Sequence, residues 1–554
     1  TFYNQIGTEQ KMIRAPLKEL RSYQQIDKEA ILKVGNTMLV KDTGTGKTLT
    51  ALAVAGELLW QNLEAQVLFS APTGVLVDQH CDYTLEQMEA GSDEVVVATG
   101  RDRQSLYNSP RAKIIFATPE TLAYDLKIIN WSRVRLVVLD ESHEVVGNDA
   151  SAQVARAIKP YQLLRLALTA SPGKRMEEII DDLDIKQIII REATDPEVAP
   201  YVFHLQRSWQ DFELPLSMKE LQQKLEAMAD KCRTFLENHK ILEKDSQPLL
   251  YQELRQEQWQ EGFPQRSQLL PLYEDLTAER KQLKRQLAEL PEDSQEARKI
   301  RRRLSVIDAA FNQVTMLIST WHMIDLLQSH GVGTLRSHLL TLLEAASDKD
   351  KLEKYSPAVR YLIKNWPLQR MVVECDQLLA NNIDHPKLEF LKAKCQEWVS
   401  AGKFVLIFSH YRHSVLNIVE VLKGLGISAQ GIMGAQSGGM PRKQQRQIIS
   451  DFRQHRFQVL VSTALLHLGI HLADVDVGAA YDGHINDIEM IQREGRVARV
   501  RDGEFWCLFT KGDCLDSAYY YSARRKRAAN RAKLRQLKDD LAAKTDNPAQ
   551  PSSG

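Results

Sequence analysis

A chain of 554 residues is too long to fold around one hydrophobic core, and it predicts roughly three to four domains. Its 43% hydrophobic and 26% charged residues are typical of a globular protein. The 72 basic and 72 acidic residues cancel, so net charge gives no sign of a nucleic-acid partner, and any such surface must come from local segregation of charge.

Cysteine usage argues against a zinc-binding or disulfide-rich protein, and hydropathy argues against a membrane-spanning one. The six cysteines are scattered without a CxxC pair, which argues against a zinc site and a disulfide framework. This usage fits a reducing intracellular compartment, cytoplasmic or nucleoid-associated. No apolar run reaches the roughly 18 residues needed to span a bilayer, and residues 1–16 do not have the pattern of a signal peptide.

The first region, residues 1–204, alternates short apolar runs with amphipathic stretches. Runs such as AQVLFSAP, AKIIFATP and VRLVVLDES are rich in Val, Ile and Leu. Strands of this kind, separated by helical patterns, predict a parallel sheet that is covered on both faces. Several of the runs end in small polar residues, where ligand-binding loops lie in open α/β sheets.

The pattern of apolar and charged residues changes twice further along the chain. Residues 205–385 have helical spacing and dense charge pairs, and they predict an all-helical domain. Residues 386–523 return to α/β texture, with runs such as KFVLIFSH and FQVLVSTA. Residues 524–554 predict a basic helix, RRKRAANRAKLRQLK, and a disordered tail. The predicted fold class is therefore α/β, with two parallel-sheet domains and an all-helical domain inserted between them.

A phosphate-binding loop is predicted in VKDTGTGKT, which follows a strand and precedes a helix. Its candidate nucleotide-binding residues are Thr43, Gly44, Thr45, Gly46, Lys47 and Thr48. The glycines let backbone amides face a polyphosphate, Lys47 can reach the β- and γ-phosphates, and the Thr48 hydroxyl can ligate Mg²⁺. The full GxxxxGK[ST] pattern would place Gly where this chain has Lys41. The alternative is a Gly-rich turn with a chance lysine.

A pair of acids follows a second apolar strand. In RLVVLDESH the strand residues deliver Asp140 and Glu141 at a strand end. One carboxylate can hold Mg²⁺ and the next can orient an attacking water as a base. An exposed acid pair is common by itself, but together with the phosphate-binding loop it indicates hydrolysis of a nucleoside triphosphate.

These motifs resemble the ATPase motifs of superfamily-two helicases with a DEAH-type box: TGTGKT, DESH and LTASPG at 168–173. The resemblance covers residues from about 14 to 525, and it implies two RecA-like domains that use ATP and Mg²⁺. It also implies that Thr169 and Ser171 act in coupling. RSYQQ is similar to an adenine-recognition motif, which implies contacts from Arg21 and Gln24.

Three further segments, SAPTGVLVDQH, VVVATG and IIFATPETL, resemble motifs that contact a nucleic-acid backbone. The residues implied are Thr73, Thr99, Gly100, Thr118 and Pro119. Small and hydroxylated residues at strand ends suit phosphate contacts that do not recognise bases. For any one of them, the alternative is a turn residue that caps a helix.

Within the superfamily, the sequence most resembles the Hef/FANCM branch, with RIG-I-like ATPases as cousins. EVVGNDASAQVA, DPEVAPYV and DHPKLEFLK are similar to segments of that branch. The resemblance implies that the helical insertion grips the duplex part of branched nucleic acid. The basic run ARKIRRR at 297–303 is compatible with this role, although such a run is commonly a solvated helix face.

The second α/β region carries the rest of the resemblance. It implies nucleic-acid contacts from His410, Gly434, Gln436 and Thr463, at or after the ends of strand-like runs. In the coupling loop Gly469 is kept, but His471 stands where the family has a carboxylate. Because a neutral imidazole supplies no fixed negative charge, this change puts the coupling of hydrolysis to movement, though not hydrolysis itself, in question. The alternative, which the sequence favours slightly, is drift within the lineage at a tolerant contact.

The segment IQREGRVAR, residues 491–499, matches the family's arginine motif. The resemblance implies Gln492 near the γ-phosphate, with Arg496 and Arg499 as arginine fingers that cross the cleft between the domains. Arginines inserted from a facing domain stabilise the charge of a phosphoryl-transfer transition state. Gly495 inside a helix would otherwise cost about 1 kcal/mol.

Two functions follow as hypotheses. The first is an ATP-driven DNA helicase or translocase on forked or branched DNA, in the setting of DNA repair, with nuclease or repair proteins as possible partners. The second is a duplex-RNA-activated ATPase of the RIG-I-like type, which acts as a sensor or clamp with little strand separation.

Overall fold

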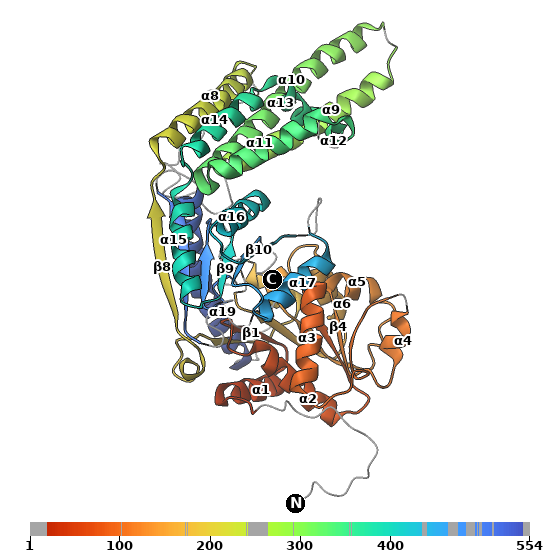
Figure 1. Ribbon diagram of the computed structural model, residues 1–554. Helices are drawn as coiled ribbons and strands as arrows, with labels where there is room; N and C mark the ends of the chain where they lie inside the picture. The colour runs from red at the N-terminus through yellow and green to blue at the C-terminus, as the bar shows by residue number, and fades with distance from the viewer. Residues whose placement is uncertain are drawn as a thin grey trace, which may run out of the picture.

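The computed structural model has two parallel sheets and a set of helices between them in sequence, which confirms the predicted fold class (Figure 1). The structure describes residues 19–546, except for residues 101, 172, 174, 240, 242–263, 292, 354, 356, 435–439, 464–471, 473–474, 484–492, 496, 498–500 and 512–514.

The first sheet has seven parallel strands in the order β3-β4-β2-β5-β6-β1-β7. Their bounds are β1 Thr37–Lys41, β2 Gln66–Ser70, β3 Val95–Val97, β4 Ile114–Ala117, β5 Val134–Leu139, β6 Leu164–Thr169 and β7 Gln187–Arg191. Helices cover both faces of this sheet: α1 Ser22–Val34, α2 Lys47–Gln61 and α3 Gly74–Gln87 on one, and α4 Arg103–Asn108, α5 Pro119–Asp125, α6 Ala150–Ile158 and α7 Met176–Asp182 on the other.

Strand β1 shows why the apolar runs are continuous. Leu39 belongs to the core on the α1–α3 face, whereas Met38 and Val40 belong to the core on the opposite face. Because successive side chains alternate between faces, a strand that is covered on both sides needs apolar residues at every position.

The helical insertion extends from one end of the second-sheet domain, away from the first sheet (Figure 1). It contains α8 Leu216–Asn238, α9 Pro264–Ala288, α10 Gln295–Asp325, the π-helical turn η4 Leu326–His330, α11 Val332–Ser347, α12 Lys349–Glu353, α13 Pro357–Asn365 and α14 Leu368–Ala380. One apolar core joins these helices, with Leu225, Phe311 and Leu339 among its buried members. In the described ranges, no helix is long and apolar enough to cross a membrane.

The second sheet has six strands in the order β10-β11-β9-β12-β13-β8. Their bounds are β8 Leu205–Phe212, β9 Val405–Phe408, β10 Ala429–Ile432, β11 Val459–Ser462, β12 Val477–Ala480 and β13 Gly503–Thr510. Helices α15 Pro386–Ser400 and α16 Arg412–Gly424 pack on one face, and α17 Arg442–Arg453 packs on the other.

Strand β8 differs from the predicted domain boundary. The sequence analysis places residues 205–385 in the helical domain, but β8 pairs with β13 over its full length and forms the edge of the second sheet. Its sequence, LQRSWQDF, lacks an apolar run because, as an edge strand, it is only partly covered. The chain therefore enters the insertion from the second sheet and returns to that sheet.

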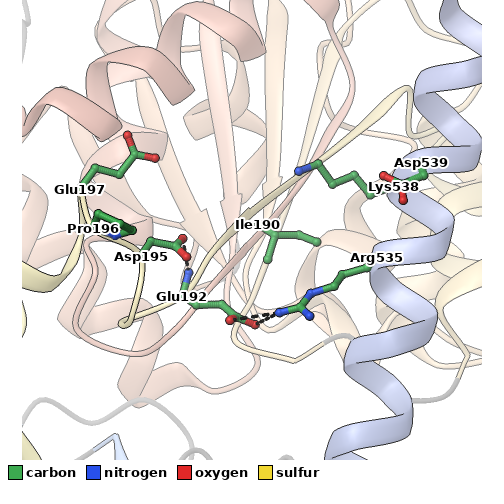
Figure 2. Close-up of a pocket in the computed structure, with 8 residues that line it drawn as sticks. All are labelled: Ile190, Glu192, Asp195, Pro196, Glu197, Arg535, Lys538 and Asp539. Atoms are coloured by element: carbon green, nitrogen blue, oxygen red, sulfur yellow. Dashed lines mark hydrogen bonds and ion pairs between the residues drawn. The ribbon is translucent and has the colours of Figure 1, made fainter.

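The C-terminal helix α19, Leu515–Asp546, leaves β13 and packs against the first-sheet domain. Leu534 is buried in the core on the α4–α7 face, and Leu537 and Leu541 pack against it. A groove of about 690 Å³ lies between α19 and the segment at the end of β7, and Arg535 contacts Glu192 in it at 3.3 Å. Figure 2 shows the residues that line this groove. The sequence predicts this basic helix but not its docking on the other domain.

We expect Leu534→Ala to destabilise the first-sheet domain by about 2–5 kcal/mol, because truncating a buried leucine removes apolar contacts and leaves a cavity. Urea unfolding would measure the change. Gln536→Ala, an exposed position on the same helix, is the matched control and should have almost no effect. Equal stabilities of the two variants would contradict the docking of α19.

Candidate functional site

The loop between β1 and α2 has the geometry of an anion site. Gly44 and Gly46 have φ values of +82° and +78°, a left-handed conformation that favours glycine. A Cβ at Gly46 would also overlap the Gln24 side chain. The Lys47 ammonium donates a hydrogen bond to the Lys41 carbonyl at 2.9 Å, so it lies against the loop at the start of α2. Amides at a helix N-terminus together with this cation favour a phosphate.

Lys41, the departure from the usual loop pattern, has a structural explanation. Its side chain is fully buried, with Nζ 2.8 Å from Asp27 Oδ2 and 2.9 Å from Thr50 Oγ1. Asp27, on α1, also accepts hydrogen bonds from Arg191 Nε and Nη2 at 2.9 and 2.7 Å. This buried ionic cluster fastens α1 and β7 to the base of the loop.

The predicted adenine-recognition residues lie beside the same loop. Gln24 is buried, and its Oε1 accepts a hydrogen bond from the Arg21 amide at 3.0 Å while its Nε2 is 3.4 Å from the Thr45 carbonyl. The Tyr23 hydroxyl donates to that carbonyl at 2.9 Å. The Arg21 guanidinium lies over the Tyr201 ring at 4.8 Å. Contact with a base stays a prediction for both residues.

Asp140 and Glu141 follow β5, two strands away from the phosphate-binding loop. Glu141 has a φ of 48°, uncommon for a residue other than glycine and often found at functional sites. Asp140 Oδ2 is 2.8 Å from His80 Nε2 on α3, and Glu141 Oε2 is 3.4 Å from His143 Nδ1. Burial lowers the pKa of His143, but the hydrogen bond to Glu141 and the charges of Glu141, Glu144 and Asp140 together raise it more, so the net shift is upward.

His80 is a residue that the sequence analysis missed. Nothing in the spacing between α3 and β5 indicates that its imidazole reaches the Asp140 carboxylate. Since a hydrogen-bond partner fixes the orientation of a ligating carboxylate, His80 has the position of a residue that orients a metal ligand.

Thr169 and Ser171 lie at the end of β6, between the acids and the phosphate-binding loop in the order β5-β6-β1. Both side chains are buried, and Thr169 Oγ1 donates to the Ser171 carbonyl at 2.8 Å while it accepts from the Ser171 amide at 3.1 Å. This closed pair links the two halves of the site.

The arginine-bearing segment of the second domain meets the phosphate-binding loop of the first. A Cβ at Gly495 would overlap the Thr43 side chain, so only glycine allows this approach of the second-domain backbone to that side chain. Gln492, Arg496 and Arg499 lie outside the described residues. Arg493, to which the sequence analysis gives no role, is fully buried 3.6 Å from Asp482.

The predicted nucleic-acid contacts of the first domain follow three adjacent strands, β2, β4 and β3. Thr73 Oγ1 caps α3 by accepting from the Leu76 amide at 3.3 Å, and Thr118 Oγ1 caps α5, which begins at Pro119. Thr99 and Gly100 are exposed. The structure brings the five residues together along one edge of the sheet. For Thr73 and Thr118, however, helix capping is by itself a sufficient reason for a threonine at that position.

Comparison with known proteins agrees with this geometry. Residues 21–179 match the family DEAD/DEAH box helicase, and residues 386–501 match the helicase conserved C-terminal domain. The ATP-dependent DNA helicase mph1 of Aspergillus fumigatus is 28% identical over 517 residues, which cover 86% of this chain and 43% of that protein. The crystal structure of the Pyrococcus furiosus Hef helicase domain matches with a TM-score of 0.60 at 28% identity, over 91% of this chain and 98% of that chain.

The chain carries both conserved domains of the superfamily-two helicases, and in sequence and fold it is similar to the Hef/FANCM branch. A putative ATP-dependent RNA helicase of Methanocaldococcus jannaschii is also similar to it, at 27% identity over 93% of this chain and 60% of that protein. The chain spans less than half the length of the fungal relatives that it matches.

In the second sheet, three of the predicted nucleic-acid contacts follow the adjacent strands β9, β10 and β11. His410 is exposed, the Gly434 carbonyl accepts a hydrogen bond from Arg412 at 3.2 Å, and Thr463 is buried with its amide bonded to the Ile432 carbonyl. Gln436 and the coupling residues Gly469 and His471 lie outside the described residues.

The helicase site fits Mg²⁺ in the way that nucleotide enzymes use it. Within the described residues no group of three or more His, Cys, Asp or Glu could hold a metal ion. Mg²⁺ is usually bound through one or two carboxylates together with substrate phosphates and water. Thr48 at the start of α2 and Asp140 after β5 are the protein groups available for that arrangement.

Burial lowers the pKa of Lys41 from 10.5 to about 8. Between these pH values the unfolded chain binds the proton that the native state has released, so stability rises with pH. We expect wild type to gain about 1 kcal/mol per pH unit relative to Lys41→Met between about pH 8 and 10.5, measured by urea unfolding. Lys33→Met, at an exposed lysine on α1, should follow wild type. If the difference in unfolding free energy between wild type and Lys41→Met did not change with pH, the lowered pKa of Lys41 would be contradicted.

Proposed function

We propose that this chain is an ATP-dependent DNA helicase or translocase that acts on forked or branched DNA. The observation that carries the proposal is the approach of the arginine-bearing segment to the phosphate-binding loop, with Gly495 against Thr43. Two domains that meet at a phosphate site can close around ATP and separate after hydrolysis. Such a cycle is the requirement for converting chemistry into movement.

In this proposal each group of the site has a separate role. The amides of Gly44 and Gly46, together with Lys47, hold the β- and γ-phosphates. Glu141 orients the attacking water and accepts its proton, while Arg496 and Arg499 stabilise the charge of the transition state. Bound Mg²⁺ would neutralise phosphate charge beside Thr48 and Asp140.

The strand-end residues of both sheets support a path for one nucleic-acid strand. Small, exposed or hydroxyl-bearing groups at Thr99, Gly100 and Thr118 suit contacts to phosphates rather than to bases. Binding of this type is insensitive to sequence and weakens as salt concentration rises. As the two sheets alternate in affinity for the strand, the enzyme would step along it.

The helical insertion supports the choice of forked or branched DNA. Seven exposed basic residues flank the turn between α9 and α10, and none forms an ion pair with another described residue: Lys281, Lys284, Arg285, Arg298, Lys299, Arg301 and Arg302. Residues 281–303 contain eight basic and four acidic residues, so in a chain whose total charge is zero this stretch has a local excess of positive charge. A duplex arm of a fork is a polyanion of the size that such a surface could contact.

The second candidate function is activation by duplex RNA without strand separation. It rests on the changed coupling loop at His471 and on the printed name of the Methanocaldococcus relative, an RNA helicase. Both functions use the same ATP site, so the activating nucleic acid distinguishes them.

We expect forked DNA to stimulate ATP hydrolysis more than single-stranded DNA of equal length, and duplex RNA to stimulate it least. A steady-state ATPase assay with the three activators measures this. Lys47→Ala is the control for the site and should lower hydrolysis on the order of 100-fold while DNA binding is retained. Stimulation by duplex RNA alone would overturn the proposal.

The triple variant Arg298→Gln/Arg301→Gln/Arg302→Gln should weaken binding to forked DNA and reduce its salt dependence, because fewer counterions are released. Binding to single-stranded DNA should change little. The matched control removes three exposed basic residues of α8 and α14 in the same insertion, Lys219, Lys231 and Arg370. Equal losses for the two triple variants in a fluorescence anisotropy titration would show that general charge, not this patch, contacts the fork.

A further inference from the structure

A buried carboxylate lies at the centre of the second domain, outside the site described above. Asp482 follows β12 and is 3% exposed. Its Oδ2 accepts hydrogen bonds from the Ser409 hydroxyl at 2.8 Å and from the His410 amide at 2.6 Å. These two residues begin the loop after β9, in which His410 is a predicted strand contact. Asp482 therefore holds the first turn of that loop in place.

The same carboxylate contacts the arginine-bearing segment. Arg493 Nη1 lies 3.6 Å from Asp482 Oδ1 and 3.5 Å from the Asp482 carbonyl oxygen, and its guanidinium lies over the Phe408 ring at 5.6 Å. Arg493 is fully buried. Two residues further on, Gly495 lies against the phosphate-binding loop. The place of this segment at the ATP site thus depends on a buried pair within the second domain.

The third contact of Asp482 is with the helical insertion. His330, the last residue of the π-helical turn η4, has Nδ1 3.6 Å from Asp482 Oδ2 and 2.8 Å from Ser414 Oγ. Burial lowers the pKa of His330 to about 3, so the imidazole is neutral and the contact is polar. A single π-helical turn inside longer helices is frequently found at functional sites.

The π-helical turn is tied to the second sheet at further points. The Tyr411 hydroxyl donates a hydrogen bond to Asp325 Oδ2 at 2.8 Å, directly before the turn. The Tyr481 hydroxyl donates to the His330 carbonyl at 3.3 Å. Displacement of the turn would therefore disturb Tyr481, which precedes Asp482, and Tyr411, which follows His410.

We propose that Asp482 is a positioning residue that makes the placement of the arginine-bearing segment depend on the strand-contact loop and on the π-helical turn of the insertion. The inference rests on the proposed function and extends it: DNA held by the insertion or by the loop would change ATP turnover through this carboxylate. Asp482 touches neither ATP nor DNA in this scheme.

The electrostatics of the cluster support this role. Burial by itself would raise the pKa of Asp482, but the charges and donors around it hold that pKa below its ordinary value. The group therefore remains a buried anion, and each partner's position affects the energy of the others. Removing one partner of a buried ion pair leaves an uncompensated charge, which gives such a cluster a strong response to small displacements.

The chain supplies a matched control at the other end of the same strand. Asp476 precedes β12, is also buried, accepts a hydrogen bond from the Phe404 amide at 2.8 Å and pairs with Arg501 at 2.9 Å. It shares a backbone amide and an arginine with Asp482, although Arg501 is 57% exposed, and neither partner belongs to the insertion or to the strand-contact loop. Asp476→Asn therefore removes a buried carboxylate next to the same strand without the proposed positioning role.

The test compares Asp482→Asn with Asp476→Asn in two assays: the ratio of DNA-stimulated to basal ATPase, and base pairs separated per ATP on forked DNA. We expect Asp482→Asn to lower both quantities about tenfold, a typical size for coupling between sites. Asp476→Asn should leave both near the wild-type values. Equal effects of the two variants, or no effect of Asp482→Asn, would overturn the inference.

Two milder variants keep the test valid if Asp482→Asn fails to fold. Tyr411→Phe and His330→Asn each alter one link to the insertion, and each should lower the stimulation ratio obtained with forked DNA more than the ratio obtained with single-stranded DNA. Equal reductions with both activators would contradict the inference. A wild-type enzyme that neither separates strands nor moves along DNA would refute the proposed function, whereas the stimulation ratios would still decide the role of Asp482.

Discussion

The approach of Gly495 to Thr43 is the constraint on which the rest of the structure depends. It sets the backbone of the second domain against the Thr43 side chain of the phosphate-binding loop, with no room for a side chain at position 495. The left-handed glycines of that loop, the acids after β5 and the arginine-bearing segment form a single site only at this separation. Each sheet supplies part of an incomplete site, and ATP chemistry requires both.

The sequence was sufficient for the parts of the molecule that are locally encoded. Buried parallel strands have continuous apolar runs, and ligand residues follow them directly, so the phosphate-binding loop, Asp140 and Glu141 could be located along the chain. What could not be predicted depends on contacts between distant segments. His80 and Asp482 have no local pattern that shows their partners, and β8 lacks an apolar run because only part of it is covered.

Lys41 illustrates how a departure from a family pattern can be read only in three dimensions. In the sequence it replaces a glycine and weakens the match. In the structure its ammonium pairs with Asp27, which also pairs with Arg191, so the charge is compensated within a closed cluster. A buried lysine beside a phosphate site would otherwise be costly. The substitution therefore changes how the loop is supported rather than whether the loop can form.

The path of the chain between the two sheets has a mechanical consequence. The segment from β7 to β8 and helix α19 both connect the first-sheet domain to the second beside the end of β7, where Arg535 meets Glu192. A separate ion pair joins the domains away from these connections, between Arg446 of α17 and Asp78 of α3 at 2.6 Å. Because these two connections lie on the same side of the first-sheet domain, they favour rotation of that domain about an axis through both and resist sliding of one domain past the other. Under the proposed function, the domains would then open by rotation, and Gly495 would return to Thr43 each time they close.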